Sequence, residues 1–345
     1  MKKITGIVST CLMAALAAGF WLRAQEPDQP TFRVKVDMVV LSFTVLDQKN
    51  KYVNGLKPKD FKIYEDDISE KVATFAEGSR SPMQVLDNGE LRPLRNAAAG
   101  EASANGGTAA VPANPDAVDA NAEATGTNVF VLFDTSNYMY RGFVYASDSI
   151  ADFIRGLDRS DSIAVYTYSR NLNRAVPLNR DRGLAIGGLR KAVAGDDSAL
   201  YNCLLLTLRD AAKVPGRKVV IVFSNGPDNA SMVSPEDVRA VAEDEGIPIY
   251  VISTSEVSKD PISSNIFKRI SANTGGKSYF AKTWQKQIEA FESIREDLGN
   301  SYTVTYYPQP NQNEGFRKIR VELTDEAMRK YKIRARPGYR PQRGF

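Results

Sequence analysis

Between residues 127 and 299, apolar positions occur in two different patterns. Short continuous apolar runs are typical of strands that are buried on both faces of a parallel sheet. Such runs are Val129–Phe133 and Lys218–Phe223, and further strands are predicted at Ser162–Ser169, Ile247–Ser253 and the shorter Lys277–Ala281, with Val176–Leu178 as a short edge strand. Between the runs, apolar side chains recur at helical spacing. The predicted helices include Phe143–Leu157, Asp181–Val193, Ala199–Lys213, Asn265–Asn273 and Trp284–Leu298. This alternation predicts an α/β fold with a doubly wound, mostly parallel sheet.

The two flanks of this region show the two-residue alternation of half-buried strands. On the N-terminal side the predicted strands are Phe32–Thr44, Phe61–Tyr64 and Val72–Phe75. On the C-terminal side they are Tyr302–Tyr307, Phe316–Leu323 and Tyr331–Arg336. Either flank alone would leave an apolar face in water, and a module this small is only marginally stable by itself. We therefore expect the flanks to form one small β-sandwich, with the α/β domain inserted between them.

Composition sets the predicted domain boundaries. From Arg92 to Gly126 the chain is dominated by Ala, Gly, Asn, Ser and Pro and has no aromatic residue, which predicts a flexible linker. The prediction is an export segment at 1–24, an N-terminal β module at 25–79, a linker at 80–126, the α/β domain at 127–299, and a C-terminal β segment at 300–345 that packs with 25–79.

The N-terminus carries the pattern of an export signal. Lys2 and Lys3 precede the uncharged segment Ile4–Leu22, which ends near Ala24. This predicts a periplasmic or extracellular protein. The apolar segment approaches the roughly 20 residues that a membrane-spanning helix needs, so an uncleaved N-terminal anchor in the inner membrane is the alternative. Such an anchor is the one membrane contact that we expect.

A carboxylate followed by two hydroxyls stands where a ligand is expected in such a fold. The apolar run Val129–Phe133 ends at Asp134, Thr135 and Ser136. In open α/β sheets, ligands bind beyond the carboxyl ends of the strands. Carboxylate and hydroxyl oxygens suit hard divalent cations such as Mg²⁺, Ca²⁺ or Mn²⁺. The sequence therefore points to a metal-type site at this edge of the sheet.

Several segments together resemble von Willebrand factor A domains. The three site segments are Asp134-Thr135-Ser136, SALYNCLLLTL from Ser198 and VVIVFSNGPDN from Val219. The flanks resemble a secreted bacterial subgroup of that family, best known from acidobacteria. The matching flank segments are FRVKVDMVVLSFTVLD from Phe32, DFKIYED from Asp60, SYTVTYYPQ from Ser301 and KIRARPGYRP from Lys332.

The resemblance implies a Rossmann-like fold and a metal-ion-dependent adhesion site. That site has the pattern D-x-S-x-S on a first loop, a Thr on a second and an Asp on a third. A partner protein completes the coordination of one divalent cation by presenting a carboxylate. The residues that map onto the metal site are Asp134, Ser136, Ser198 and Asn225. Because Tyr138 replaces the last Ser and Asn225 replaces the Asp, we expect a degenerate site that holds a divalent cation weakly or serves metal-free recognition.

Composition bears on the class of function. The chain has no histidine, which removes the commonest general base, and we find no catalytic constellation, so we predict that the protein is not an enzyme. A formal charge of only +4 gives no reason to expect nucleic-acid binding. Basic residues near the C-terminus alternate with apolar ones, which predicts the outer face of a strand.

The leading hypothesis is therefore an exported module for protein binding and cell adhesion. Its predicted partner contacts are Tyr138, Tyr140, Asp197 and Asp228. Tyrosines are enriched at interfaces, and we expect both of these at least partly exposed because they follow a strand end. The alternative is a structural protein of an envelope assembly in which the site is vestigial.

Overall fold

The computed structural model describes residues 38–94, 126–254 and 259–341. Every described residue belongs to one compact unit within 37–345. The predicted export segment and residues 95–125 of the predicted linker lie outside the described residues, so these predictions stay untested. Among the described residues, no helix is both long and apolar enough to cross a membrane.

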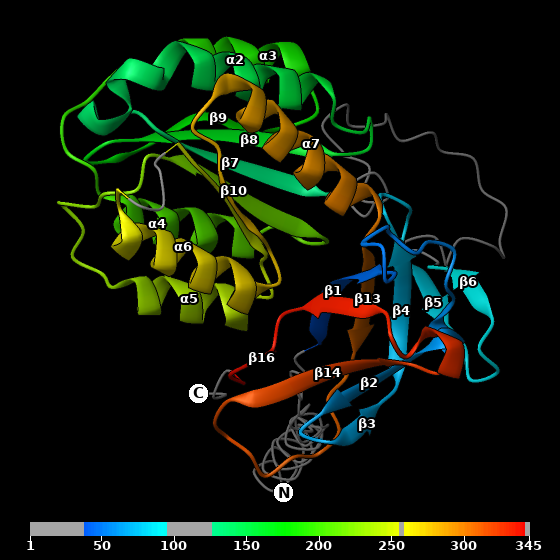
Figure 1. Ribbon diagram of the computed structural model, residues 1–345. Coiled ribbons are helices and arrows are strands. Elements are labelled where there is room, and N and C mark those ends of the chain that lie inside the picture. Colours follow the sequence, from blue (N-terminus) through cyan, green and yellow to red (C-terminus); the bar gives the residue numbers. More distant parts are fainter. Residues whose placement is uncertain (1–37, 95–125, 255–258, 342–345) are drawn as a thin grey trace, which may run out of the picture. The chain divides into compact units, whose positions relative to one another are not determined.

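A six-stranded sheet forms the centre of the α/β part (Figure 1). Its strand order is β12-β11-β10-β7-β8-β9, and every pairing is parallel except that of the edge strand β9. The strands are β7 (Asn128–Asp134), β8 (Ser162–Tyr168), β9 (Leu172–Asn179), β10 (Lys218–Ser224), β11 (Ile249–Ser253) and β12 (Ser278–Phe280). All seven residues of β7 are buried, as the continuous apolar run predicts.

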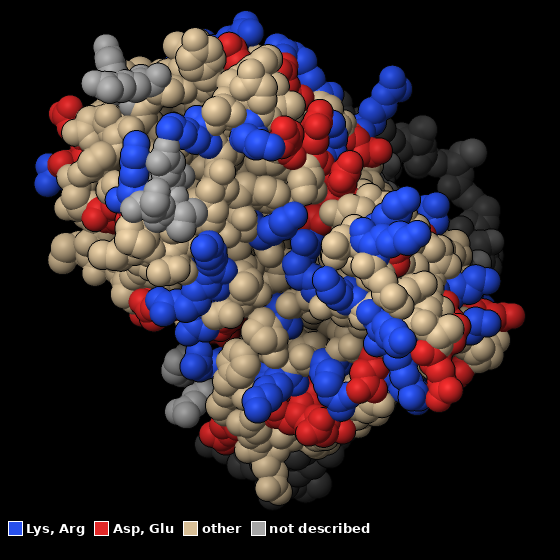
Figure 2. All heavy atoms as spheres, viewed as in Figure 1, with Lys and Arg blue, Asp and Glu red and all other residues tan. Residues whose placement is uncertain are grey.

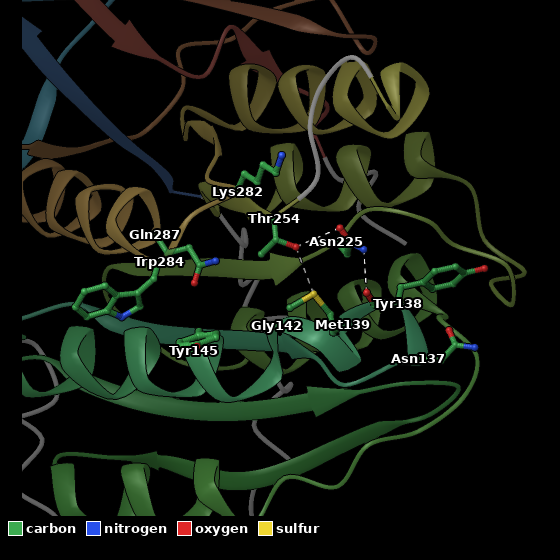
Figure 3. Close-up of a pocket in the computed structure, with 10 residues that line it drawn as sticks. All are labelled: Asn137, Tyr138, Met139, Gly142, Tyr145, Asn225, Thr254, Lys282, Trp284 and Gln287. Carbon is green, nitrogen blue, oxygen red and sulfur yellow. Dashed lines mark hydrogen bonds between the residues drawn. The ribbon is translucent and has the colours of Figure 1, made fainter.

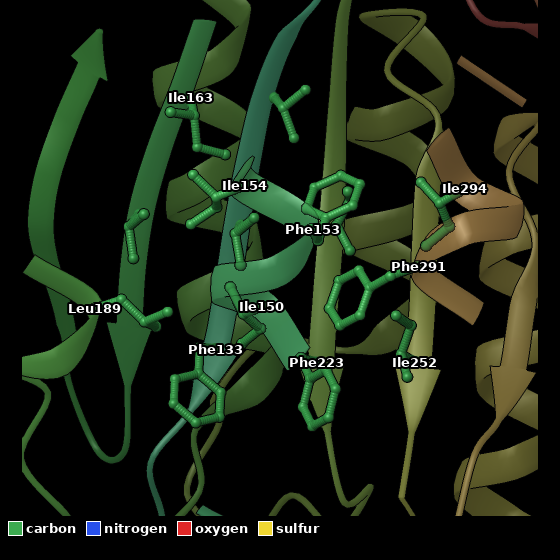
Figure 4. Close-up of a cluster of buried hydrophobic side chains, with 14 of the residues drawn as sticks. Phe133, Ile150, Phe153, Ile154, Ile163, Leu189, Phe223, Ile252, Phe291 and Ile294 are labelled. Carbon is green, nitrogen blue, oxygen red and sulfur yellow. The ribbon is translucent and has the colours of Figure 1, made fainter. Parts of the chain in front are cut away.

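Helices cover both faces of this sheet (Figure 1). One face packs against α2 (Phe143–Arg155), α3 (Arg182–Arg190) and α7 (Trp284–Gly299), with Phe133, Phe153, Phe223 and Phe291 in the core between them (Figure 4). The other face packs against α4 (Leu200–Ala212), α5 (Pro235–Asp244) and α6 (Pro261–Thr274). The doubly wound, mostly parallel α/β fold predicted from the sequence is confirmed.

The local sequence sets where these helices begin and end. Ser234 caps α5, accepting from the N–H of Asp237, whose carboxylate bonds back to the Ser234 N–H. Asp260 caps α6 by accepting from the N–H of Ser263, and the helix is followed by Gly275, which has a φ of 84°. That left-handed conformation favours glycine. The caps at the start of α5 and α6 fix the two helices beside β10 and β11.

The N- and C-terminal strands share two sheets. The larger has the order β15-β1-β13-β4-β5-β6 and the smaller β16-β14-β2-β3. The N-terminal members are β1 (Val39–Leu46), β2 (Phe61–Glu65), β3 (Ile68–Glu70), β4 (Val72–Glu77), β5 (Met83–Val85) and β6 (Leu91–Pro93). The C-terminal members are β13 (Tyr302–Tyr306), β14 (Arg317–Leu323), β15 (Lys332–Ala335) and β16 (Gly338–Tyr339). Short 3₁₀ turns lie at Pro58–Asp60 and Glu326–Met328.

One hydrophobic core joins the two sheets. Its aromatic centre consists of Phe43, Phe61, Phe75 and Tyr302, whose rings lie 5.0–6.3 Å apart. Strands from both ends of the chain contribute to this core. The small sandwich that the alternating flanks predicted, with the α/β domain inserted, is therefore confirmed.

Two sequence predictions need correction. Residues 83–93, which we assigned to the linker, contain the β5–β6 hairpin on the edge of the larger sheet. Arg334 and Arg336 do not lie on an outer strand face. Arg334 pairs with the buried carboxylate of Asp297 at 2.6 Å, and Arg336 is 5% exposed. Buried backbone carbonyls and carboxylates need donors, and these guanidinium groups supply them.

Candidate functional site

The carboxyl ends of three neighbouring parallel strands bring their last side chains together. β7 ends at Asp134, β8 at Tyr168 and β10 at Ser224. Asp134 is paired with Tyr168 in the register of β7 and β8, and Phe223 is paired with Phe133 on the other side. Because the strands are parallel, these residues reach the same edge of the sheet.

Protein donors surround the Asp134 carboxylate. Ser224 Oγ donates to Asp134 Oδ2 at 2.7 Å, and the Tyr168 hydroxyl lies 3.0 Å from the same oxygen. The two hydroxyls are 3.1 Å apart. The backbone N–H of Ser136 donates to Oδ1 at 2.9 Å. Gly226, with a φ of 122°, donates its N–H to Ser224 Oγ and so completes a hydrogen-bonded cluster.

This cluster is closed to solvent. Asp134 and Ser224 are 0% exposed and Tyr168 is 1% exposed. Burial raises the pKa of Asp134, and the hydrogen bonds from Ser224, the Ser136 backbone and Tyr168 act in the opposite direction. Burial and the neighbouring Asp134 also raise the pKa of Tyr168 well above its usual value. The phenol is therefore a neutral hydrogen-bonding group.

The second predicted loop contributes Ser198, which reaches the same cluster. The Ser198 hydroxyl lies close enough to Tyr168 to lower the pKa of the phenol. Ser136 and Ser198 are 1% and 0% exposed, and their hydroxyl oxygens make no hydrogen bond of ordinary geometry within the described residues, although they lie close to Asp134 and Tyr168. The structure thus places Asp134, Ser136 and Ser198 in one buried cluster below the surface.

Asn225 bonds to residues of the neighbouring loops instead of to the Asp134 carboxylate. Its Nδ2 donates to the carbonyl of Tyr138 at 2.9 Å, and its Oδ1 accepts from Thr254 Oγ1 at 3.1 Å (Figure 3). Further backbone bonds join the first two loops, from Gly195 N–H to the Thr135 carbonyl and from Asn137 N–H to the Asp196 carbonyl. The loops are therefore tied to one another above Asp134.

The predicted partner residues differ in their exposure and in their contacts. Tyr138, on the 3₁₀ turn η3 (Asn137–Gly142), is 39% exposed, whereas the side chain of Tyr140 lies outside the described residues. Asp197 faces Arg170 at 3.5 Å and accepts from Asn229 Nδ2 at 3.2 Å. Asp228 accepts from the N–H groups of Tyr201, Ala230 and Ser231, so it caps the first turn of α4.

We tested whether this donor set suits a divalent cation that bridges to a partner. In favour, Ser136 Oγ and Ser198 Oγ are buried oxygens that lack protein donors. Against it, both oxygens of Asp134 already accept hydrogen bonds, and the Asn225 amide is bound elsewhere. The described residues contain no group of three or more Asp, Glu, His or Cys side chains placed to hold a metal ion. Because the one carboxylate is closed to solvent and both its oxygens are already hydrogen-bonded, these residues do not fit a cation that bridges to a partner.

An open pocket lies beside the closed cluster. Its volume is about 530 Å³, and its walls include Tyr138, Met139, Tyr145, Lys282, Trp284 and Gln287. In Figure 3, Trp284 and Tyr145 lie on one side, Tyr138 and Asn137 on the other, and Asn225, Thr254 and Met139 between them. Tyr145 is 62% exposed and Trp284 is 43% exposed, whereas Met139 is 2% exposed. The pocket therefore has exposed aromatic walls and a buried apolar floor.

Sequence reasoning missed Tyr168, Ser224 and the pocket residues on α7. Tyr168 follows the apolar run of β8, the same signal that singled out Asp134, and Ser224 directly precedes Asn225. Strand ends could therefore have identified both. Trp284 and Lys282 lie about 150 residues from Asp134 in the sequence, and no local pattern connects them.

A mostly parallel sheet covered by helices on both faces, with three loops meeting at one edge, defines a doubly wound α/β domain. Residues 128–294 match the family described as von Willebrand factor type A domain. This part of the chain is therefore a von Willebrand factor A domain, as its motifs predicted. A comparison with curated proteins found no match.

Parts of the chain are similar to solved structures from several bacteria. BatB from Bacteroides thetaiotaomicron is 16% identical, and the match covers 50% of this chain and 97% of that one, with a TM-score of 0.43. A von Willebrand factor type A protein from Catenulispora acidiphila is 12% identical over 64% of this chain and 68% of that one, with a TM-score of 0.43. The vWF domain of the type V pili tip protein Mfa5 from Porphyromonas gingivalis is 12% identical over 54% of this chain and 98% of that one, with a TM-score of 0.42.

Proposed function

We propose that this is an exported, non-enzymatic binding protein that recognises a protein partner at the carboxyl edge of its A-domain sheet without a bridging cation. The supporting observation is the pocket with the exposed rings of Tyr138, Tyr145 and Trp284. Exposed aromatic side chains around a preformed hollow are typical of the centre of a protein interface. Export itself remains the prediction made from the basic and apolar N-terminus.

The floor of the pocket is held in place before any partner arrives. Asn225 links the Tyr138 carbonyl to Thr254, and Thr254 Oγ1 lies 3.6 Å from the sulfur of Met139. Gln287 donates to the Ala281 carbonyl at 3.3 Å, which fixes the start of α7. A preorganised surface spends less conformational entropy on binding, which supports recognition at this edge.

The closed state of Asp134 favours a second candidate, a structural envelope protein whose ancestral site is vestigial. In that case the carboxylate and its donors serve only stability, and the pocket has no ligand. The two candidates differ in one respect that can be measured: whether the exposed rings of the pocket are needed for an interaction.

Partner capture with the full chain tests the proposal. Wild type, the double variant Tyr145→Ala/Trp284→Ala and the control Tyr307→Ala are immobilised and exposed to envelope extract, with and without chelator. Tyr307 is 51% exposed and lies just beyond β13, so it matches the removed rings in exposure. We expect a protein that binds wild type and the control, is lost with the double variant and is insensitive to chelator. Capture that survives the double variant, or that needs divalent ions, contradicts the proposal.

A further inference from the structure

The small sandwich has two incompletely paired strand edges, on β14 and on β15. Among the described strands, β15 pairs only with β1 and so forms an edge of the larger sheet. β14 pairs with β2 along Ile319–Leu323. On the other side of β14, within the described residues, β16 pairs only with Arg317 and Lys318. Most of that side of β14 is therefore without a neighbouring strand.

Hydrogen bonds show which backbone groups of β14 point away from β2. In an antiparallel strand, the N–H and C=O groups of successive residues point alternately to the two sides. The Lys318 carbonyl accepts from the N–H of Asp66, which follows β2, at 2.9 Å. The Ile319 N–H instead donates away from β2, to the segment before β16, at 2.8 Å. Val321 and Leu323 lie two and four residues further along, so their N–H and C=O groups also point away from β2.

The same reasoning applies to β15. The Val45 carbonyl in β1 accepts from the N–H of Val53 at 2.9 Å, on the side of β1 opposite β15. The two neighbours of Val45 therefore face β15, where they are paired with Arg334 and Lys332. Ile333 lies between these two residues, so its N–H and C=O groups point away from β1.

A groove of about 710 Å³ lies at these two edges. Its walls include Val321 and Leu323 of β14, Ile333 of β15, and Met328 and Tyr331 from the connection between them. All but Leu323 are partly buried side chains that pack against the core of the sandwich, and Leu323 belongs to that core. Unpaired strand edges are templates for a further strand, and apolar positions beside them receive its alternate side chains.

The charges around the groove largely compensate one another. Glu322 pairs with Arg320 and stands opposite Lys62 in the register of β14 and β2. Arg329 pairs with Glu326 at 2.9 Å. A groove with such a balanced rim is complementary to an uncharged segment rather than to a strongly charged one.

We infer that the groove between β14 and β15 binds an extended, uncharged segment of a partner protein as an added β-strand, with apolar side chains at alternate positions packing against Val321 and Ile333. This inference goes beyond the proposed function, because the groove belongs to the sandwich and shares no residue with the pocket of the A domain.

Two peptides that differ only in their backbone test the inference. The first is acetyl-Ser-Thr-Val-Thr-Val-Thr-Ser-amide, which has a strand-forming, uncharged sequence. The second has the same side chains but carries N-methyl groups on both Val amides, which removes the N–H donors along one edge of the strand. Each is titrated calorimetrically into the full chain, and amide hydrogen exchange with residue resolution locates the binding site.

We expect the unmodified peptide to bind and the N-methylated peptide to bind at least about tenfold more weakly, because backbone hydrogen bonds are lost. The unmodified peptide should slow exchange at the amides of Val321, Leu323 and Ile333. Exchange at Arg320 and Glu322 should not change, because their amides already face β2.

A variant that fills the groove provides a second test. Val321→Tyr places a larger side chain in the groove and should weaken binding of the unmodified peptide by about tenfold or more. Val144→Tyr is the matched control, because Val144 is 67% exposed on α2 and lies outside the groove. Melting temperatures show whether both variants are folded, and if Val321→Tyr is not, the two peptides and the exchange data decide.

Absence of binding at millimolar peptide overturns the inference, and so does equal binding of the two peptides. Protection at the edge strands β9 or β6 in place of β14 and β15 overturns it as well. Unchanged binding by a folded Val321→Tyr contradicts it in the same way. Self-association of the full chain that Val321→Tyr abolishes would assign the groove to a second copy instead of a partner protein.

Discussion

Asp134 is the residue on which the account of the site depends. Its carboxylate is fully buried, and within the described residues two hydroxyls and a backbone N–H surround it. Burying a carboxylate is costly unless its oxygens are well hydrogen-bonded or a positive charge lies nearby. In this protein, hydrogen bonds from Ser224, Tyr168 and the Ser136 backbone surround the Asp134 carboxylate. These bonds require the three strand ends to lie close together.

The raised pKa of Asp134 predicts a particular pH dependence of stability. Because burial places the folded-state pKa above the unfolded one, the folded state binds this proton more tightly. The free energy of unfolding therefore gains a contribution as the pH falls through the folded-state pKa, and this contribution is fully present below the unfolded-state pKa. Asp134→Asn lacks the titration. We expect wild type to gain stability relative to Asp134→Asn between about pH 7 and about pH 4 in urea unfolding.

The matched control for this comparison is Asp152→Asn. Asp152 has a side chain that is 54% exposed and pairs with Arg155 on α2. Because an exposed pair of this kind contributes about 1 kcal/mol or less, the difference in unfolding free energy between wild type and this control should stay small throughout. The burial argument is contradicted if the difference in unfolding free energy between wild type and Asp134→Asn stays constant, or if acidification stabilises the variant relative to wild type.

The Tyr168 hydroxyl should contribute measurably to stability. Tyr168→Phe keeps the buried ring but removes a group that lies 3.0 Å from Asp134 Oδ2 and 3.1 Å from Ser224 Oγ. Leaving a buried acceptor with one donor fewer costs about 1–3 kcal/mol. We expect a lower urea midpoint with an unchanged slope. Tyr166→Phe is the control, because its hydroxyl makes only a 3.4 Å contact with Asp210, and an equal loss in both variants would refute the special role of Tyr168.

At the scale of secondary structure, long periodic segments were predictable and short pairings were not. The run Val129–Phe133 and the helical spacing of Ile150, Phe153 and Ile154 identified β7 and α2 because burial on a sheet dictates both patterns. β5, β6 and β16 have only two or three residues each. Such strands are too short to show a two-residue alternation, so only their pairing with neighbouring strands defines them.

The same distinction separates what was predictable at the site. Asp134 was found because it ends an apolar run, and Ser198 because its segment follows a family pattern. The contacts of Tyr168 with Asp134 depend on strand register, and those of Asn225 with Tyr138 and Thr254 depend on how three loops fold. The residue types were therefore readable in the sequence, whereas the burial of the site was a property of packing.

Glu65 joins strands from both ends of the chain and provides a test at this scale. Its buried carboxylate accepts from the hydroxyls of Tyr306 and Tyr339 at 3.0 and 2.9 Å and pairs with Arg317 at 2.9 Å. Removing one member of a buried ion pair typically costs about 3–5 kcal/mol. We expect Glu65→Ala to lower the unfolding free energy by about that amount in urea titrations.

An exposed pair on the same sandwich serves as the comparison. Arg320 and Glu322 are each 46% exposed, so Glu322→Ala should cost about 1 kcal/mol or less. If Glu65→Ala is as mild as Glu322→Ala, the buried cluster does not hold the C-terminal strands to the N-terminal ones.

For the whole molecule, the insertion of the A domain into a sandwich followed from the apolar faces of the two flanks. What sequence could not show was how the sandwich contacts the helices. Arg336 donates to the carbonyls of Val40 and Glu243, and Arg217 donates to the carbonyl of Gly78 at 2.9 Å. Both charges sit among backbone carbonyls that belong to distant segments, so their burial depends on the complete fold.

Charge on the surface is mixed at this scale. On the face drawn in Figure 2, Lys and Arg side chains are interspersed with Asp and Glu. Exposed ion pairs such as Arg320–Glu322 contribute to this pattern. Interspersed charges favour solubility more than the attraction of one highly charged partner. Specific recognition is therefore expected from the pocket rather than from a broad electrostatic field.

Thermal unfolding of the full chain with divalent ions tests the central claim most directly. The melting temperatures of wild type and Asp134→Asn are compared in chelator and in millimolar Mg²⁺, Ca²⁺ or Mn²⁺. A cation held by Asp134 in the folded state would raise the melting temperature of wild type by mass action. The closed cluster predicts no rise in wild type beyond that of the variant. A rise in wild type that Asp134→Asn abolishes would show that the cluster opens to hold a cation, contrary to this account.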